Sequence, residues 1–363
     1  MSAQGALKLN SFPEPGDRFK LDEVIRVSSF GKTYIAKDTQ ESDRLVVVKI
    51  QEITALNEKY LKDECKLLRD VSSHPNIIDF YEIFCIKNEL MIVTEYCEGG
   101  PILKIVNDLL EKNRRMKEEH IAHILKEVVK ASSYLHEKHI IHRDIKASNI
   151  FLTKNGEVKI GGFGLSISLA STFGRSSSAI GSPDWMAPEV IQAKDAESLN
   201  YDNRSDVWSV GITAIELGDG KTPFKDMHPT RVLFQVVRNP PPTLYRTSNW
   251  SENYNDFIAE CLVKNPEHRP YMTELMGHPF MEEVPENNYH LSTELTSLIM
   301  PSSQRAFTTQ DDVHVMNNIL WDGENRNDGP MYVEDLAALD EIEKVQLCPR
   351  LNNDLTTSNT RHM

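Results

Sequence analysis

The stretch IHRDIKASN, residues 141–149, decides the fold of this chain. It follows residues 118–139, in which apolar side chains recur at the spacing of an α-helix, and we expect a strand after it. The stretch itself is charged and polar, so we interpret it as a loop between the two elements. Its chemically capable side chains are Asp144, Lys146 and Asn149. The alternative is an ordinary charged surface turn.

On the N-terminal side of this loop, residues 19–95 predict a small β-rich lobe with one main helix. Polar gaps of hairpin length separate five runs of β-type sequence, which are FKLDEVIRV, KTYIAKD, RLVVVKI, DFYEIFCIK and ELMIVTEYC. A helical stretch interrupts the runs, and four of its residues share roughly one face: Leu61, Glu64, Leu67 and Leu68. Because Lys49 lies in the run VVVKI and precedes this helix, a pair between Lys49 and Glu64 is expected.

On the C-terminal side, residues 96–281 predict a larger, mostly helical lobe. Helical spacing recurs in DVWSVGITAIEL and NDFIAECLVK, and the run NPPP at 239–242 marks a loop. Three further motifs follow in order, GSPDWMAPE, DVWSVG and NPEHRP. Residues 1–18 are expected to form a polar leader, and residues 282–363 a largely disordered tail, because their periodicity is weak. The expected fold class is therefore α+β, with two lobes.

Composition excludes several classes of protein. The 363 residues carry a formal net charge of −14, which argues against nucleic-acid binding as the main role. The 5 cysteines are odd in number and form no CxxC pair, so we expect neither a disulfide framework nor a cysteine zinc site, and a reducing compartment fits better. The sequence shows no signal-peptide core and no apolar run long enough to span a membrane.

These motifs, in this order, resemble those of the eukaryotic protein-kinase family. The strings GSPDWMAPEVI, ELGDGKTPFKDMHPT and RNPPPTL resemble the Ste20 group of serine/threonine kinases. MHPTRVLFQVVRNPPPTL and the tail string MYVEDLAALDEIEK resemble class III unconventional myosins, in particular their insect photoreceptor form. In that family a kinase domain precedes an actin-based motor, and the tail string resembles the linker to it. The residues after Glu343 do not resemble the start of a motor, so we expect none in this chain.

The resemblance implies roles for the motif residues. In such kinases Asp144 would accept the proton of the substrate hydroxyl, Lys146 would reach the transferred phosphate and Asn149 would bind magnesium. Lys49, fixed by Glu64, would hold the phosphates of ATP. The other residues expected around ATP are Ile25, Thr33, Val47, Thr94, Glu95, Cys97 and Leu152. A protein substrate or docking partner, a cytoplasmic location and an association with the actin cytoskeleton are implied as well.

Three residues are expected to have structural roles. Glu189 of the APE motif would pair with Arg269, and Asp206 would accept backbone hydrogen bonds from the catalytic loop. The spaced histidines of the catalytic region are an alternative metal site, which we reject because no single helix would place them on one face: His136, His139 and His142. In the activation segment, the candidate phosphorylation sites, against the alternative of a flexible serine-rich loop, are Thr172, Ser176, Ser177 and Ser178.

The chain departs from the family pattern on the nucleotide side. The DFG motif reads GGFG, so Gly162 stands where an aspartate normally binds the magnesium bridging the phosphates, whereas Phe163 is kept. The glycine-rich loop GxGxxG reads RVSSFG at 26–31, which should hinder close approach of phosphates. Thr33 stands where valine is usual, and Val47 replaces the alanine of VAIK and adds bulk beside adenine.

Three hypotheses follow from this contrast. We weigh most heavily a pseudokinase or weakly active kinase that serves as a regulatory or docking module. The alternative is an active ATP-dependent serine/threonine kinase that phosphorylates proteins. A third is a nucleotide sensor that binds ATP without magnesium. ATP is thus expected as a cofactor on family grounds, while Gly162 argues against ordinary magnesium binding.

Overall fold

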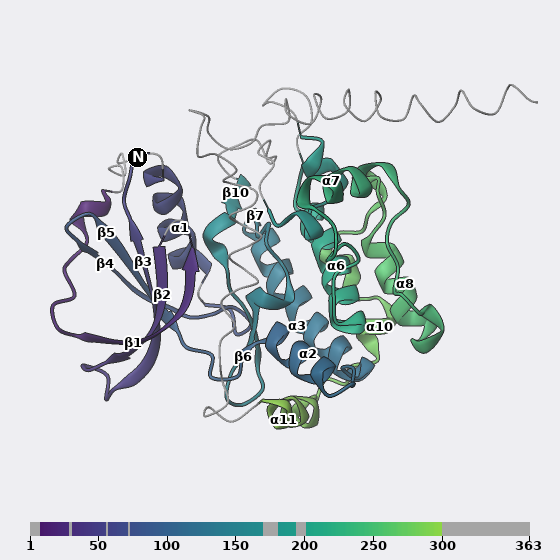
Figure 1. The fold of residues 1–363 in the computed structure, drawn as a ribbon, viewed down its shortest axis with the longest axis horizontal. Coiled ribbons are helices and arrows are strands. Elements are labelled where there is room, and N and C mark those ends of the chain that lie inside the picture. Colours follow the sequence, from purple (N-terminus) through teal and green to yellow (C-terminus); the bar gives the residue numbers. More distant parts are fainter. Residues whose placement is uncertain are drawn as a thin grey trace, which may run out of the picture. The chain divides into compact units, whose positions relative to one another are not determined.

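The protein folds into two lobes, a β-rich lobe and a mostly helical one, as Figure 1 shows. This arrangement confirms the predicted α+β, two-lobed fold. In the computed structural model the residues described are 8–28, 31–55, 57–71, 73–169, 181–193 and 201–299.

The β-rich lobe is an antiparallel sheet of five strands with one helix against it, in the order β1-β2-β3-β5-β4. Its elements are β1 (Phe19–Ser28), β2 (Gly31–Asp38), β3 (Arg44–Glu52), α1 (Glu58–Val71), β4 (Phe80–Ile86) and β5 (Glu89–Glu95). The four α1 residues expected on one face are all buried: Leu61, Glu64, Leu67 and Leu68. The helical periodicity in the sequence therefore marked the face that packs into the core.

Strand register aligns the candidate nucleotide residues. Lys49 on β3 lies opposite Thr33 on β2, and two residues earlier Val47 lies opposite Thr94 on β5. Because alternate residues of a strand point to the same face of a sheet, Val47 and Lys49 share one face. Pairing of the strands, rather than closeness in sequence, makes these four residues neighbours.

The segment before β1 packs onto the lobe instead of forming a free leader. Leu9, in a short 3-10 turn, is only 2% exposed and belongs to the main hydrophobic core. The carbonyl of Pro13 accepts a hydrogen bond from the backbone amide of Cys85 on β4, at 3.0 Å. Residues 9–13 therefore pack against the β-rich lobe, ahead of the predicted start of the domain at Phe19.

The helical lobe is built around α6, which is buried along nearly its whole length and contacts α3 and α8. Its helices are α2 (Ile102–Glu111), α3 (Glu118–Glu137), α4 (Pro188–Ile191), α6 (Arg204–Asp219), α7 (Pro229–Arg238), α8 (Glu252–Cys261), α9 (Met272–Leu275), α10 (Pro279–Glu282) and α11 (Tyr289–Leu298). Its short strands are β6 (Gly100–Pro101), β7 (Ile140–Ile141), β8 (Ile150–Leu152), β9 (Val158–Ile160) and β10 (Ile167–Ser168). Among the described residues, no helix combines the length and apolar character that crossing a membrane requires.

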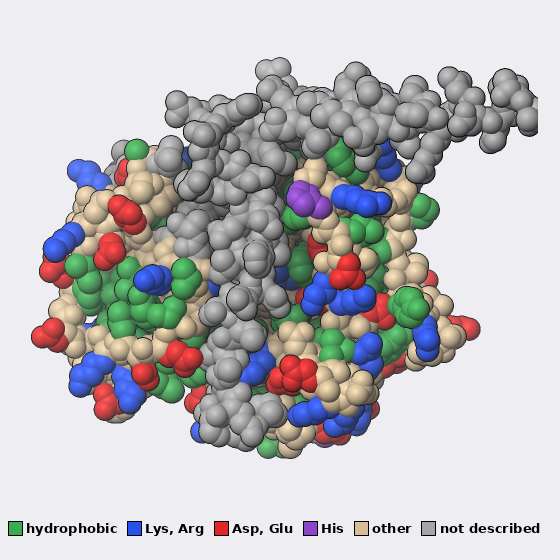
Figure 2. Space-filling model, in the orientation of Figure 1, with side chains coloured by type: hydrophobic (Ala, Val, Ile, Leu, Met, Phe, Trp, Pro, Cys, Tyr) green, Lys and Arg blue, Asp and Glu red, His purple; other side chains and the backbone are tan. Residues whose placement is uncertain are grey.

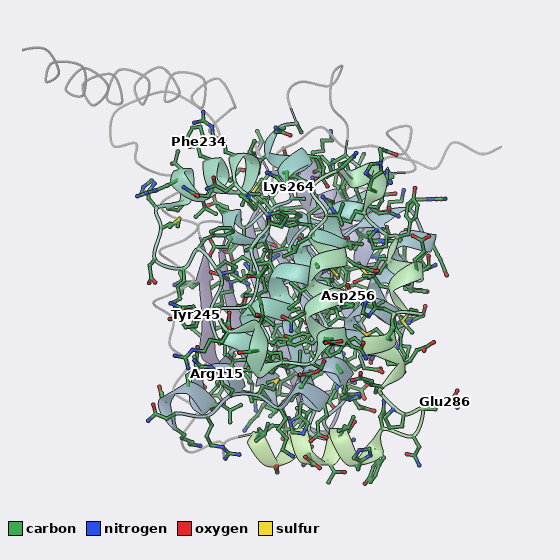
Figure 3. All side chains as sticks on the ribbon, turned by 90° about the vertical axis from the view of Figure 1, so that its right-hand side faces the viewer. Arg115, Phe234, Tyr245, Asp256, Lys264 and Glu286 are labelled. Atoms are coloured by element: carbon green, nitrogen blue, oxygen red, sulfur yellow. The ribbon has the colours of Figure 1, made fainter. Side chains whose placement is uncertain are left out.

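Helix α11 corrects the expectation of a disordered tail for residues 282–299. Leu291 and Leu295 are buried, and the helix packs against α3. Glu286, in the connection that leads to this helix, points away from the body of the lobe (Figure 3). Its three leucines, Leu291, Leu295 and Leu298, stand in a polar segment and did not lead to a predicted helix; its core-facing side becomes evident only against α3. Residues 300–363 lie outside the described part of the chain.

Candidate functional site

The loop 142–149 carries a closed network of polar groups around Asp144. The Asn149 amide nitrogen donates to the Asp144 carboxylate at 2.6 Å and to its backbone carbonyl at 2.8 Å. The Lys146 ammonium lies 3.2 Å from the other carboxylate oxygen, Oδ1. Ser182 joins them, because its hydroxyl accepts from Lys146 and donates to Asp144, both at 2.8 Å. The structure thus brings the three expected catalytic residues together and adds Ser182.

This network controls the charge of Asp144. Burial by itself would raise the pKa of the carboxyl. The ammonium of Lys146 and the hydrogen bond from Ser182 outweigh burial and hold the pKa of Asp144 below its usual range. The carboxylate is therefore ionised at neutral pH, as a group that accepts a proton from a hydroxyl must be.

Asp206, at the start of α6, accepts hydrogen bonds from the backbone of the same loop. Its carboxylate accepts the backbone amides of His142 and Arg143, each at 2.8 Å, and the ring nitrogen Nε2 of His136 lies 2.9 Å from it. These bonds hold Arg143 at a φ of 67°, which is unusual for a residue with a side chain. Asp206 thus makes the backbone contacts expected of it.

Lys49 and Glu64 form the expected ion pair, with Nζ and Oε1 2.7 Å apart. The pair joins β3 to α1, so it fixes the helix against the sheet. Phe163 is buried beside it in the segment after Gly162, with its ring 5.0 Å from that of His142. The apolar part of the altered DFG motif therefore packs inside the protein.

The magnesium side of the site is different. Gly162 has a φ of 83°, and a Cβ placed on it would lie 2.6 Å from the Asn149 side chain. Asn149 is 2% exposed, and its amide nitrogen is directed at Asp144. Magnesium needs several oxygen ligands, and kinases supply them from the DFG aspartate and this asparagine. With a glycine in the first position, only the side-chain oxygen of Asn149 remains from that pair, so the residues present do not complete the set.

Gly31, the one glycine of the family pattern that remains in the altered glycine-rich loop, is explained by the packing of the strands. Strands β1 and β2 pair up to Ser28 and Gly31, with Arg26 opposite Thr33. A Cβ on Gly31, whose φ is 151°, would lie 2.0 Å from the carbonyl oxygen of Ile50 on β3. Gly31 is thus required by the packing of strands, independently of any phosphate. Among the predicted nucleotide residues, Ile25 lies at an irregularity in the β1–β2 register.

The remaining predicted nucleotide residues lie at the end of β5, just after it, and in β8. The Glu95 carboxylate is already bound, 2.8 Å from the Lys159 ammonium. Burial raises the pKa of the Cys97 thiol to about 12, so this cysteine is unreactive at neutral pH. Leu152 is fully buried under Gly99, where a Cβ would approach it to 2.7 Å. Glu95 and Leu152 therefore have structural contacts of their own.

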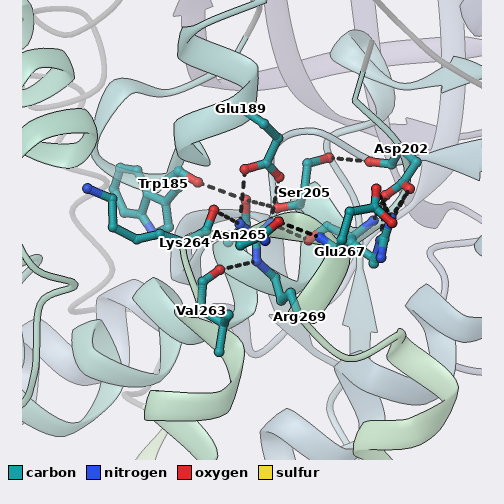
Figure 4. A network of polar contacts seen from close by, with 11 residues as sticks. Trp185, Glu189, Asp202, Ser205, Val263, Lys264, Asn265, Glu267 and Arg269 are labelled. Carbon is teal, nitrogen blue, oxygen red and sulfur yellow. Dashed lines mark hydrogen bonds and ion pairs between the residues drawn. The ribbon is translucent and has the colours of Figure 1, made fainter. Parts of the chain in front are cut away.

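Glu189 and Arg269 form a buried, bidentate ion pair (Figure 4). The two guanidinium–carboxylate distances are 2.6 and 2.9 Å. The Arg269 Nε donates to the carbonyl of Val263 at 2.9 Å. The pair ties the end of the activation segment to the helical lobe.

Sequence reasoning missed Glu216 as well as Ser182. The Glu216 carboxylate on α6 accepts the backbone amide of Ala147 at 2.9 Å and the indole N–H of Trp185 at 3.3 Å. Burial raises its pKa to about 7. Ser182 follows a glycine in a motif that was recognised, but its own role had no signal in residue spacing.

The predicted phosphorylation sites lie outside the described residues: Thr172, Ser176, Ser177 and Ser178. The three spaced histidines that the sequence reasoning rejected as a metal site have different surroundings. His139 is exposed at the end of the α3 connection, while the His142 ring bonds the carbonyl of Gly161 at 2.9 Å.

Comparison with known proteins agrees with the fold and the motifs. Residues 19–281 match the family model described as "Protein kinase domain". The chain belongs to the protein kinase family, and its domain is a serine/threonine kinase domain of the Ste20-like kind.

Among its relatives, the chain is similar to the Drosophila melanogaster "Neither inactivation nor afterpotential protein C", with 42% identity over 90% of the chain and 22% of that protein. It is 39% identical to human "Myosin-IIIa" over 80% of the chain and 18% of that protein. The same identity, 39%, relates it to the Caenorhabditis elegans "Serine/threonine-protein kinase mig-15", over 78% of the chain and 27% of the relative. The chain thus spans roughly a fifth to a quarter of these relatives. The class III myosin resemblance seen in the sequence is confirmed for the kinase region.

Proposed function

We propose that this chain is a kinase-family domain with a degraded nucleotide site, either inactive or weakly active, which serves as a regulatory or docking module. A partner protein, bound without phosphate transfer, would then be its main ligand. The name of its relative "Myosin-IIIa" supports an association with the myosin cytoskeleton, and we place the module in the cytoplasm as part of a longer protein or assembly.

One observation carries this proposal. The side chain of Asn149 fills the space beside Gly162, and its amide nitrogen is directed at the Asp144 carboxylate. The aspartate that would share a metal with Asn149 is missing, so of this pair only the Asn149 side-chain oxygen could hold the metal. Loss of one preorganised electrostatic group from such a site typically costs about 3–4 kcal/mol of transition-state stabilisation, or 10²–10³ in rate.

Two measurements on the purified chain test the proposal. Thermal unfolding with and without ATP, in the presence and absence of magnesium, reports nucleotide binding. Transfer of radiolabelled phosphate, beside the variant Asp144→Asn, reports catalysis. No transfer and no thermal shift would support a docking module alone. Phosphate transfer by the parent chain at a rate typical of kinases, if it is lost in the Asp144→Asn variant, would overturn the proposal.

A second candidate function is an active protein kinase. It is favoured by the ion pair of Lys49 with Glu64 at 2.7 Å and by the ionised Asp144, because both belong to an assembled catalytic geometry. In that case the substrates are serine or threonine residues of proteins. The nucleotide-sensor hypothesis would instead be supported by an ATP-dependent thermal shift that magnesium does not change.

A further inference from the structure

A cavity of about 650 Å³ lies on the helical lobe, away from the catalytic loop. Helix α3 forms one wall, and the chain around Glu157 and the loop 74–76 form others. Thr273 and Met276, at α9, and Asn288 and Ser292, at the start of α11, line it as well. Its volume falls in the range of protein ligand sites, which are about 300–1,000 Å³.

The part of the cavity wall that α11 supplies is held by specific contacts with the rest of the lobe. His123 of α3 lies 3.2 Å from the Asn288 amide and 3.4 Å from the Ser292 hydroxyl. A Cβ on Gly156 would lie 2.1 Å from the carbonyl oxygen of Ser292, so only glycine allows this approach. The cavity therefore depends on residues beyond 281, where the kinase family model stops matching.

The cavity is lined by an excess of negative charge. Its carboxylates are Glu127, Glu137 and Glu157, against one ammonium, that of Lys130. Lys130 is paired with Glu127 at 2.6 Å. Glu137 and Glu157 are exposed, and within the described part of the chain neither makes an ion pair. Burial lowers the pKa values of the two lining histidines, so they add no positive charge at neutral pH: His74 and His123.

An unused hydrogen-bonding group lies among these charges. The Ser133 hydroxyl lines the cavity and is buried, with no partner among the described residues. This hydroxyl and the two exposed carboxylates of the lining offer acceptors to a ligand that carries several N–H donors. The arginine guanidinium has five such donors in a fixed plane and a permanent charge.

We propose that this cavity is a docking site for an arginine-bearing segment of a partner protein. The proposal rests on the docking function proposed above and specifies the chemistry of the partner. One arginine guanidinium sits against Glu137 and a second against Glu157, and the residues between them fill the rest of the cavity. Because peptide binding is measured apart from nucleotide binding and transfer, this proposal and the proposed function can fail separately.

The test uses a fluorescein-labelled nonapeptide with two arginines separated by one leucine, and its twin with citrulline in place of arginine. Citrulline keeps nearly the same shape but has no charge. Fluorescence anisotropy with the full chain should show the arginine peptide binding at least about tenfold more tightly than the citrulline peptide, and more weakly as salt is raised. Equal binding of the two peptides, or binding of neither, would overturn the proposal.

Matched variants locate the site. The double change Glu137→Gln and Glu157→Gln should weaken binding of the arginine peptide about tenfold, since it removes two exposed carboxylates of the cavity. The double change Glu41→Gln and Glu286→Gln removes the same charge from exposed positions outside the lining and should leave affinity unchanged. If both double variants weaken binding equally, binding depends on the net charge of the protein and not on this cavity, and the proposed site is refuted.

A third variant tests the α11 wall. Ser292→Lys places an ammonium at the mouth of the cavity and should abolish binding of the arginine peptide. Thermal unfolding of this variant shows whether the lobe remains folded. A folded Ser292→Lys protein that binds as tightly as the parent would also overturn the proposal.

Discussion

Replacing Gly162 by alanine tests whether the space beside it is already filled. The new Cβ would lie 2.6 Å from the Asn149 side chain, so that side chain must move. The backbone at a φ of 83° adds about 1–2 kcal/mol for a residue with a Cβ. Losing the hydrogen bond from Asn149 to the charged Asp144 adds about 1.5–3 kcal/mol.

The sum, about 2.5–5 kcal/mol, should lower the free energy of unfolding measured in urea. For a domain of this size it corresponds to roughly 5–20 °C in Tm, at about 2–4 °C per kcal/mol. Gly162→Asp is the matched partner variant, because it meets the same Cβ contact and adds a carboxylate. We expect it to be destabilised similarly without ligand, and to regain stability with ATP and magnesium together, whereas Gly162→Ala should not.

A Gly162→Ala protein within about 0.5 kcal/mol of the parent would refute this reasoning, since 0.5 kcal/mol is the usual size of a neutral substitution. It would mean that Asn149 leaves its place at little cost. Equal stabilisation of the alanine and aspartate variants by ATP with magnesium would instead refute the view that the missing carboxylate limits metal binding.

Three further substitutions have expected outcomes. Glu216, with its pKa raised to about 7 from 4.5, keeps a proton in the folded state that the unfolded chain loses as pH rises through this window, so stability should fall by about 3 kcal/mol between pH 4.5 and pH 7. Glu216→Gln should flatten that dependence in urea unfolding; an unchanged slope would contradict the assignment. Glu189→Gln leaves the Arg269 guanidinium buried without its anion and should cost about 3–5 kcal/mol in the same assay, while a loss under 1 kcal/mol would show that the pair is dispensable. Leu9→Ala should cost about 2–4 kcal/mol, and a neutral result would show that the segment before β1 does not contribute to the core.

The exposed large apolar residues of the β-rich lobe lie mainly on its edge strand β1, where they are Leu21, Val24 and Val27, and Leu45 on β3 is exposed as well. Figure 2 shows hydrophobic side chains gathered on one face of this lobe.

The sequence by itself determined the two lobes, the five strands, the α1 face and the pairs Lys49–Glu64 and Glu189–Arg269. These features depend on local periodicity or on motifs whose order is fixed along the chain. It also showed that the metal-binding aspartate is missing, because that needs only the identity of Gly162.

Only the tertiary structure showed that the Asn149 side chain occupies the space beside Gly162. The conformation of this side chain depends on its hydrogen bond to Asp144 across the loop. The tertiary structure also decided the roles of Ser182 and Glu216, whose partners lie far away along the chain. The packing of α11 belongs to the same group, since two buried leucines identify a helix face only when α3 is present to receive them. Local sequence carries periodicity and residue identity; contacts between distant segments arise only when the chain has folded.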